Sequence, residues 1–147
     1  MAANLLCCNT MNAEELRQRT AEFARRVIKF VRPLLNDQGT RHAASQLLRA
    51  ATSVAANYRS ACVARSHREF TSRLGIVLEE ADESKLWVGF LQNLDAKPSE
   101  ELKALSREAH ELTAIFAASC HTSRRRGQAL TGSRGRKRQQ SDGPLTK

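Results

Sequence analysis

The sequence is poor in the residues that mark metal sites, disulfide frameworks and membrane spans. Aromatic residues make up 5% of its 147 residues, so a core must be built mainly from Leu, Val, Ile and Ala. The four cysteines, Cys7, Cys8, Cys62 and Cys120, form no CxxC pair. No stretch reaches the ~18 apolar residues of a membrane helix, and the start lacks the features of a secretory signal. We therefore expect a protein of the reducing cytoplasm, with Cys62 as a reduced structural thiol.

Sequence motifs for enzyme chemistry are also missing. There is no Gly-rich phosphate loop, no nucleophile elbow and no Cys/His pairing. Di-iron bundles place a Glu three residues before a His, but Arg107 holds that position before His110, and His42 and His67 have no Glu there. We interpret His67, which has basic neighbours, as a solvated side chain. We expect no catalytic residues, no metal and no cofactor.

Apolar residues at helical spacing predict four helices, and no segment has the period of a strand. The apolar stripes are Leu16, Phe23, Val27, Phe30 and Leu34; Leu47, Ala51, Val54, Tyr58 and Ala61; Phe70, Leu74, Val77, Leu78, Ala81 and Val88; and Leu102, Leu105, Ala109, Leu112 and Phe116. With short connections between them, these segments predict an all-α fold, an antiparallel up-and-down four-helix bundle.

Capping and turn residues mark where each helix begins and ends. The predicted N-caps are Asn12 with Glu15 as a capping box, Thr40, Ser66 with Glu69 as a second capping box, and Ser99. Pro33 and the turn at 36–39 end the first helix, and the segment 95–98 ends the third. The second helix is rich in Ala and Ser, which eases close approach of backbones without loss of helix propensity.

The basic character of the chain lies mainly in its C-terminal part. Residues 121–147 carry eight Lys or Arg and one acidic residue, a net charge of +7, whereas residues 1–120 have a net charge of +2. This part has too little apolar surface to fold alone. We therefore predict a disordered N-terminal extension at 1–11, the bundle at 12–120 and a disordered Arg-rich tail at 121–147. A start at Met11 is an alternative to Met1.

Several basic groups are candidates for neutralising the phosphates of a nucleic acid. One is an outward row on the first helix, the second flanks the corner between the second and third helices, and the others lie in the tail. In that order they are Arg25, Lys29 and Arg32; Arg59, Arg65 and Arg68; and Arg124, Arg125, Arg126, Arg134, Arg136, Lys137 and Arg138. Rows of charge are also common on solvated faces, so each group alone is weak support.

The third helix carries apolar residues on two faces, where a surface helix needs one stripe. Its second face consists of Ile76, Leu86, Trp87, Phe90 and Leu94. Two interpretations are open. A central helix can touch two neighbours within one bundle, or the second face can form an interface between subunits. We favour the subunit interface for the C-terminal half of the helix.

The sequence resembles a bacterial four-helix-bundle family. The resemblance lies in residues 46–49, 53–58, the corner at 64–70 and the run 78–83 followed by Trp87. This family includes the proteins encoded by intervening sequences in 23S ribosomal RNA genes and is related to the accessory variability determinants of diversity-generating retroelements. The resemblance covers roughly residues 14–118 and leaves out the tail. It implies a homopentamer without catalytic residues. The related branch binds nucleic acid and a reverse transcriptase.

The same resemblance marks Arg49 and Asn57 as signature polar residues. Both lie near an apolar stripe, where a polar group needs partners. We expect them to be structural and to meet acids of the third helix, with Glu80 and Glu83 as the first candidates.

The sequence thus favours a non-enzymatic, homo-oligomeric bundle that associates with nucleic acid through basic surfaces. The alternative is a protein-interaction scaffold, for example an accessory subunit of a reverse transcriptase that does not itself bind nucleic acid.

Overall fold

The computed structural model describes residues 12–94 and 99–138, with side chains as far as residue 129. In this part of the chain it contains the helices α1 (Ala13–Val31), η1 (Leu34–Asn36, a short 3-10 helix), α2 (Arg41–Cys62), α3 (His67–Leu94) and α4 (Glu100–Arg138). The predicted all-α class is confirmed. The predictions for residues 1–11, for the break at 95–98 and for residues 139–147 lie outside the described residues.

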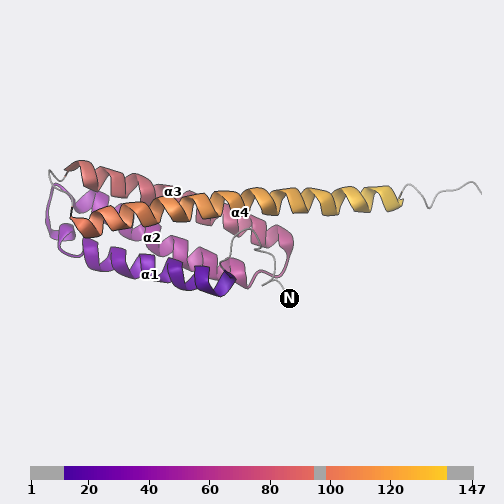
Figure 1. Ribbon diagram of the computed structural model, residues 1–147, viewed down its shortest axis with the longest axis horizontal. Coiled ribbons are helices and arrows are strands. Elements are labelled where there is room, and N and C mark those ends of the chain that lie inside the picture. Colours follow the sequence, from indigo (N-terminus) through magenta and orange to yellow (C-terminus); the bar gives the residue numbers. More distant parts are fainter. Residues whose placement is uncertain (1–11, 95–98, 139–147) are drawn as a thin grey trace, which may run out of the picture.

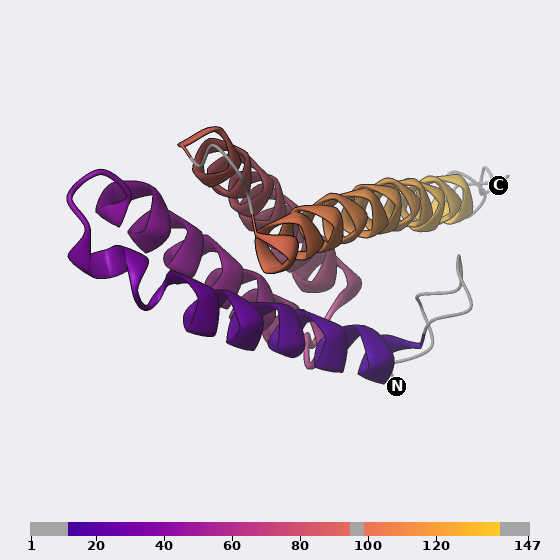
Figure 2. The same ribbon diagram turned by 60° about the vertical axis from the view of Figure 1, so that its left-hand side comes forward.

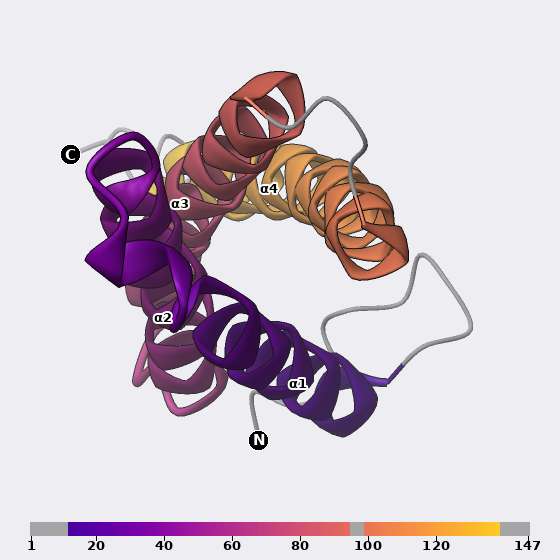
Figure 3. The same ribbon diagram turned by 90° about the vertical axis from the view of Figure 1, so that its left-hand side faces the viewer.

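The four long helices form an up-and-down bundle, as predicted. α1 packs against α2, α2 against α3 and α3 against α4, with successive helices running in opposite directions (Figure 1). Viewed from the side and along the bundle, they surround one interior (Figures 2 and 3). Within the described residues, no helix has the length and apolarity needed to cross a membrane.

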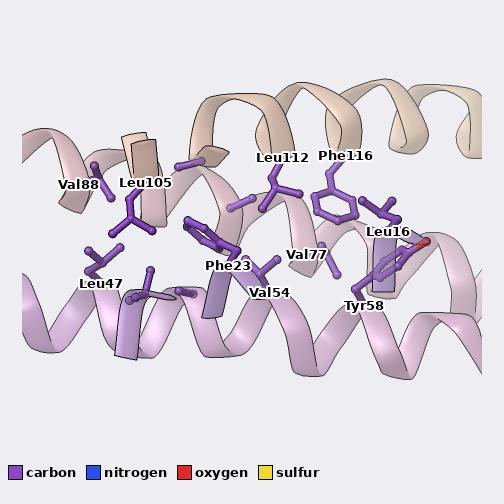
Figure 4. Close-up of a cluster of buried hydrophobic side chains, with 14 of the residues drawn as sticks. Leu16, Phe23, Leu47, Val54, Tyr58, Val77, Val88, Leu105, Leu112 and Phe116 are labelled. Atoms are coloured by element: carbon purple, nitrogen blue, oxygen red, sulfur yellow. The ribbon is translucent and has the colours of Figure 1, made fainter. Parts of the chain in front are cut away.

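The predicted apolar stripes form the core of this bundle. Phe23 of α1, Val54 and Tyr58 of α2, Val77 of α3 and Phe116 of α4 point into the shared interior (Figure 4) and are at most 1% exposed. Phe30, Leu34 and Leu78 are partly buried at its margin. α2 also buries a series of alanines, which let it lie close to both α1 and α3: Ala43, Ala44, Ala50, Ala51 and Ala61.

Side-chain caps fix the starts of three helices. Asn12 and Glu15 form the predicted capping box, with Glu15 N donating to Asn12 Oδ1 at 2.8 Å and Asn12 N donating to Glu15 Oε2 at 2.9 Å. Ser99 Oγ accepts from Leu102 N at 3.1 Å and caps α4. Thr40 precedes α2 without capping it, because its hydroxyl donates to Leu34 O and to a carboxylate of the preceding turn.

The capping box predicted at the α2–α3 corner is half correct. Ser66 Oγ accepts from Glu69 N at 3.1 Å, as expected. The Glu69 carboxylate, however, accepts from Arg65 N at 3.0 Å and not from Ser66 N. The carboxylate therefore reaches one residue further back and ties the corner itself to the first turn of α3.

Ion pairs join α1 to α4, the first and the last helix of the bundle. Arg19 donates from Nε to Glu108 Oε1 at 2.6 Å and from Nη2 to Glu108 Oε2 at 2.9 Å, and it also pairs with Glu111. These carboxylates, Glu108 first, raise the pKa of Arg19. Arg26 pairs with Glu101 at 2.9 Å near the other end of the same seam. Bidentate pairs of this kind fix the relative register of two helices.

α4 does not end at residue 120, the predicted end of the bundle. α4 continues through Cys120 and the first arginines to Arg138, and it projects beyond the end of the bundle where α1 begins and α3 starts (Figure 1). The helix continues because α3 supplies partners past residue 120, with Cys120 and Ser123 buried at 2% and 6% exposure. The expected disorder at 121–138 is thus replaced by a helix.

Candidate functional site

Two of the groups of arginines that the sequence treated separately come together at one end of the bundle. We call this region the basic end, and it consists of Arg59, Arg65, Arg68, Arg124, Arg125 and Arg126. Arg59 lies in the last turn of α2, Arg65 in the corner and Arg68 in the first turn of α3. All six arginines are exposed.

A junction between α3 and α4 brings these arginines together. His67 Nε2 lies 2.9 Å from Ser123 O, and the hydroxyls of Thr71 and Ser123 are 2.5 Å apart. One turn further along α4, a Cβ atom on Gly127 would lie 3.4 Å from His67 Nε2. His67 and Ser123 are sequence neighbours of Arg68 and Arg124, so the corner and α4 place their arginines at the same end of the bundle.

The interpretation of His67 as a solvated side chain is therefore wrong. Its ring is partly buried and bonded to a carbonyl of α4. Sequence spacing did not reveal this contact, because His67 and Ser123 are 56 residues apart and Ser123 lies in the segment expected to be disordered.

The arginines of the basic end differ from the arginines that join one helix to another by ion pairs. Among the described residues, none of its six arginines forms an ion pair, whereas Arg19, Arg26 and Arg49 each pair with a carboxylate of another helix. Arg73, one turn after Glu69, is 3.8 Å from that carboxylate and is thereby partly neutralised. Unneutralised positive charge therefore collects at this end of the molecule.

Part of the positive charge in the basic row of α1 is neutralised by an acidic neighbour. Arg25, Lys29 and Arg32 are exposed, as expected for an outward face. Arg25, however, pairs with Glu22 at 2.6 Å one turn earlier on α1. This row consequently offers less free charge than the basic end.

The remaining basic candidates lie near the end of α4. Arg134, Arg136, Lys137 and Arg138 are four of the last five residues of the helix. Seven uncharged residues, 127–133, separate them from Arg126. Cations at the C-terminus of a helix are favoured by its dipole, which is consistent with the helix persisting through this sequence.

The second face of α3 contains a ridge of three exposed apolar side chains. Leu86, Phe90 and Leu94 follow each other at four-residue spacing and are 53%, 47% and 60% exposed. Trp87 lies beside this ridge, partly buried, with its ring centroid 5.5 Å from that of Phe90. Ile76 is 40% exposed but lies apart from the ridge, in an open depression beside Arg68 and Arg73.

The prediction for the signature polar residues is correct for one pair. Arg49 donates to Glu83 Oε1 at 2.5 Å, and the same oxygen accepts from Trp87 Nε1 at 3.1 Å. Asn57 instead donates to Ser53 O of its own helix at 3.0 Å. Within the described part of the chain, the buried Glu80 Oε2 has no hydrogen-bond partner, so the expected contact between Asn57 and Glu80 is absent.

Other reactive side chains are held in the core. Cys62 and Cys120 are free thiols, and burial raises the pKa of each. No cluster of three or more His, Cys, Asp or Glu suited to a metal ion occurs in residues 12–94 and 99–138.

Comparison with known proteins agrees with the bundle and with its characteristic corner. Residues 13–118 match the family model of the 23S rRNA-intervening sequence protein. The chain belongs to this family. The match ends five residues before Ser123, so the projecting part of α4 is outside the segment that the family model covers.

A solved structure supports the same assignment. A protein of unknown function from the S23 ribosomal protein family of Bacteroides thetaiotaomicron is 27% identical to this chain, with a TM-score of 0.68. The alignment covers 76% of this chain and 99% of that one. No curated protein matches the chain. Family membership thus establishes the bundle, and the role of its basic end has to be argued from the site.

Proposed function

We propose that this member of the 23S rRNA-intervening sequence protein family is a non-enzymatic, homo-oligomeric protein that binds nucleic acid in the cytoplasm. The observation that carries the proposal is the basic end, where six exposed arginines from α2, the corner, α3 and α4 lie together without an ion pair among the described residues. Phosphates of a nucleic acid are the natural partners of such a surface.

The argument for binding rather than catalysis comes from the junction beside the arginines. Ser123 and His67 are the nearest approach to a nucleophile and a base, but His67 Nε2 is bonded to the Ser123 carbonyl oxygen and not to its hydroxyl. The hydroxyl pairs with Thr71 instead. This arrangement positions two helices and leaves no base available to activate the serine.

The proposed oligomer uses the ridge of Leu86, Phe90 and Leu94. An exposed apolar ridge of this kind is costly in water and is typical of an interface. Family resemblance implies a homopentamer, and closed rings repeat one surface around an axis. Repetition of the basic end would strengthen binding through multivalency, because each further contact is made within an already bound complex.

The free thiols support the proposed cytoplasmic localisation. Cys62 and Cys120 are unpaired in the structure and belong to different helices of the core. Reduced thiols persist in the cytoplasm, where disulfides are kept reduced.

Binding is tested by measuring affinity for duplex and single-stranded nucleic acid over a range of salt concentrations. We expect the logarithm of the binding constant to fall with the logarithm of salt concentration by about 0.7 to 0.9 per phosphate contact. Absence of binding to any nucleic acid at low salt contradicts this part of the proposal.

Assembly is tested by light scattering after size exclusion. Phe90→Asp places a charge in the ridge and is expected to dissociate the oligomer. Ile28→Asp is the matched control, because Ile28 is 45% exposed, close to the 47% of Phe90, and lies on α1 away from the ridge. A wild-type monomer at micromolar concentration, or dissociation by both substitutions alike, contradicts the assignment of the interface.

The ridge also supports a second candidate, a scaffold whose oligomer docks another protein such as a reverse transcriptase. A pull-down from lysate with and without nuclease separates the two. A partner that survives nuclease treatment supports the scaffold, whereas a partner that is lost supports bridging by nucleic acid.

A further inference from the structure

We infer that the basic end and the projecting part of α4 form one site for double-stranded DNA, with the helix of α4 lying in the major groove. This inference rests on the proposed nucleic-acid binding and goes beyond it by naming the form of the nucleic acid and the element that enters it. The segment that enters the groove lies beyond the part of the chain that the family model matches.

The first step is that one helix, α4, carries basic residues both at the bundle surface and in the projection. The contact of 2.9 Å between His67 Nε2 and Ser123 O places the arginines of the corner against the start of the projection. Arg124, Arg125 and Arg126 follow at once along α4, and the helix then continues to Arg138. Positive charge on α4 therefore lies in two clusters, at 124–126 and at 134–138, separated by seven uncharged residues, and both belong to the one helix that projects from the bundle (Figure 1).

The second step concerns aromatic side chains. Single strands are bound by basic grooves that contain exposed aromatic rings on which bases stack. The aromatic residues nearest the basic end, Tyr58, Phe70 and Phe116, are 0%, 6% and 0% exposed. Phe90 and Trp87 lie in the opposite half of α3, beside acidic residues. This surface can hold phosphates but has no exposed Phe, Tyr or Trp on which a base can stack, which favours a duplex over a single strand.

The third step concerns the shape of the projection. The 11 residues from Gln128 to Arg138 extend the helix by roughly 16 Å at 1.5 Å per residue. A helix about 10–12 Å across fits the major groove of B-form DNA, which is about 12 Å wide. The major groove of A-form RNA is deep and narrow and does not admit side chains. A projecting basic helix is therefore suited to duplex DNA rather than duplex RNA.

The composition of the projection is consistent with a helix that is reinforced by its ligand. Gly132 and Gly135 disfavour a helix, and the closely spaced arginines repel one another. Phosphates on both sides of a groove would neutralise these charges. Binding is therefore expected to increase the helical content of the chain, measured by circular dichroism, when duplex DNA is added.

The experiment uses the full-length chain and four probes of one sequence: duplex DNA, duplex RNA, single-stranded DNA and single-stranded RNA. Fluorescence anisotropy is recorded between about 50 and 200 mM salt, a range over which phosphate contacts change affinity strongly. The expected result is tightest binding to duplex DNA. Replacing Arg124, Arg125 and Arg126 by Gln should make the salt slope for duplex DNA less steep, by up to about 0.9 for each lost contact.

Two controls separate the effects of where the charges lie, and of the helical shape of the projection, from the effect of the number of charges. The triple change Arg25→Gln, Lys29→Gln and Arg32→Gln removes the same three charges from the first-helix row and should leave the slope unchanged. Ala129→Pro interrupts the projecting helix without changing its charge. It should weaken binding to duplex DNA and abolish the preference over duplex RNA, whereas Gly132→Ala should preserve both.

Different outcomes overturn different statements. Preference for a single strand or for duplex RNA, equal effects of the two triple changes, or no effect of Ala129→Pro would each overturn the inference while the proposed nucleic-acid binding stands. Failure to bind all four probes would overturn both.

Discussion

His67 Nε2 lies 2.9 Å from Ser123 O, so the first turn of α3 holds α4 beyond the point where the apolar stripe of α4 ends. The Thr71 hydroxyl adds a second contact to Ser123. A Cβ on Gly127 would approach His67 to 3.4 Å, which shows how closely the two helices lie at this point. These small polar contacts replace the hydrophobic packing that holds the rest of the bundle.

His67→Ala is expected to loosen the junction selectively. Loss of one hydrogen bond costs about 1 kcal/mol, which corresponds to roughly fivefold faster exchange of amide hydrogens where opening is local. Mass spectrometry should find this increase in residues 121–128. His110→Ala is the matched control, because exposed His110 contacts Ser106 O of its own helix. Equal changes with both variants would show that His67 does not hold α4.

The seam between α1 and α4 should depend on Arg19. Its guanidinium is 24% exposed and bonds both oxygens of Glu108, which is 19% exposed. Hydrogen bonds to charged groups are worth about 1.5–3 kcal/mol, so Arg19→Ala should lower the free energy of unfolding by that order in urea denaturation. A double-mutant cycle with Glu108→Ala should recover a coupling energy of at least ~0.5 kcal/mol.

The control for this pair is Arg17 with Glu14, which are exposed neighbours on one helix. Pairs of that kind contribute little to stability, because solvent screens the two charges. A cost for Arg17→Ala equal to that for Arg19→Ala would mean that the seam has no special role.

Much of the fold was predictable because the stripes of α1 to α4 repeat at helical spacing and because Asn12 and Ser99 are good caps. The end of α4 was not predictable in the same way. Beyond Cys120 the sequence has few apolar residues, and the helix is continued by polar contacts with α3. Such contacts depend on which residues two helices bring together, which periodicity within one helix does not reveal.

The candidate site was likewise predictable from the sequence only in part. Each arginine of the basic end was identified from its charge and its place in a cluster along the sequence, but the grouping of the two clusters required the antiparallel pairing of α3 with α4. Of the two acids expected as partners of Arg49 and Asn57, Glu83 does pair with Arg49. The expectation was wrong for Asn57, because its amide donates to the Ser53 carbonyl of its own helix.

Glu83 should control the environment of the only tryptophan in the chain. Its Oε1 accepts from both Trp87 Nε1 and Arg49. Glu83→Ala is expected to shift the emission of Trp87 to longer wavelength, because the indole loses its partner and gains water. The side chains of Arg49 and Glu83 are 56% and 31% exposed, so loss of their ion pair should lower the free energy of unfolding by less than about 1 kcal/mol. Asp82→Ala removes a neighbouring acid that pairs with Lys85 and should leave the emission unchanged; a shift of equal size would contradict a specific role of Glu83.

Tyr58 should limit the stability of the bundle at high pH. Its hydroxyl is buried and makes no hydrogen bond within residues 12–94 and 99–138. Burial raises its pKa well above the usual value near 10, and the adjacent Cys62 thiol adds to the rise. The folded chain therefore keeps the proton while the unfolded chain loses it above about pH 10, so this residue lowers the free energy of unfolding by up to about 1.4 kcal/mol per pH unit from there.

Tyr58→Phe removes both the titration and the unpaired hydroxyl while it keeps the ring against Phe116, whose centroid is 5.3 Å away. An unsatisfied buried group costs about 1–3 kcal/mol, so the variant should be at least as stable as the wild type at pH 7. Its stability should also fall less steeply than that of the wild type above pH 10, when both are measured by urea denaturation across the alkaline range. Parallel curves for the two proteins would show that the Tyr58 hydroxyl ionises as readily in the folded chain as in the unfolded one.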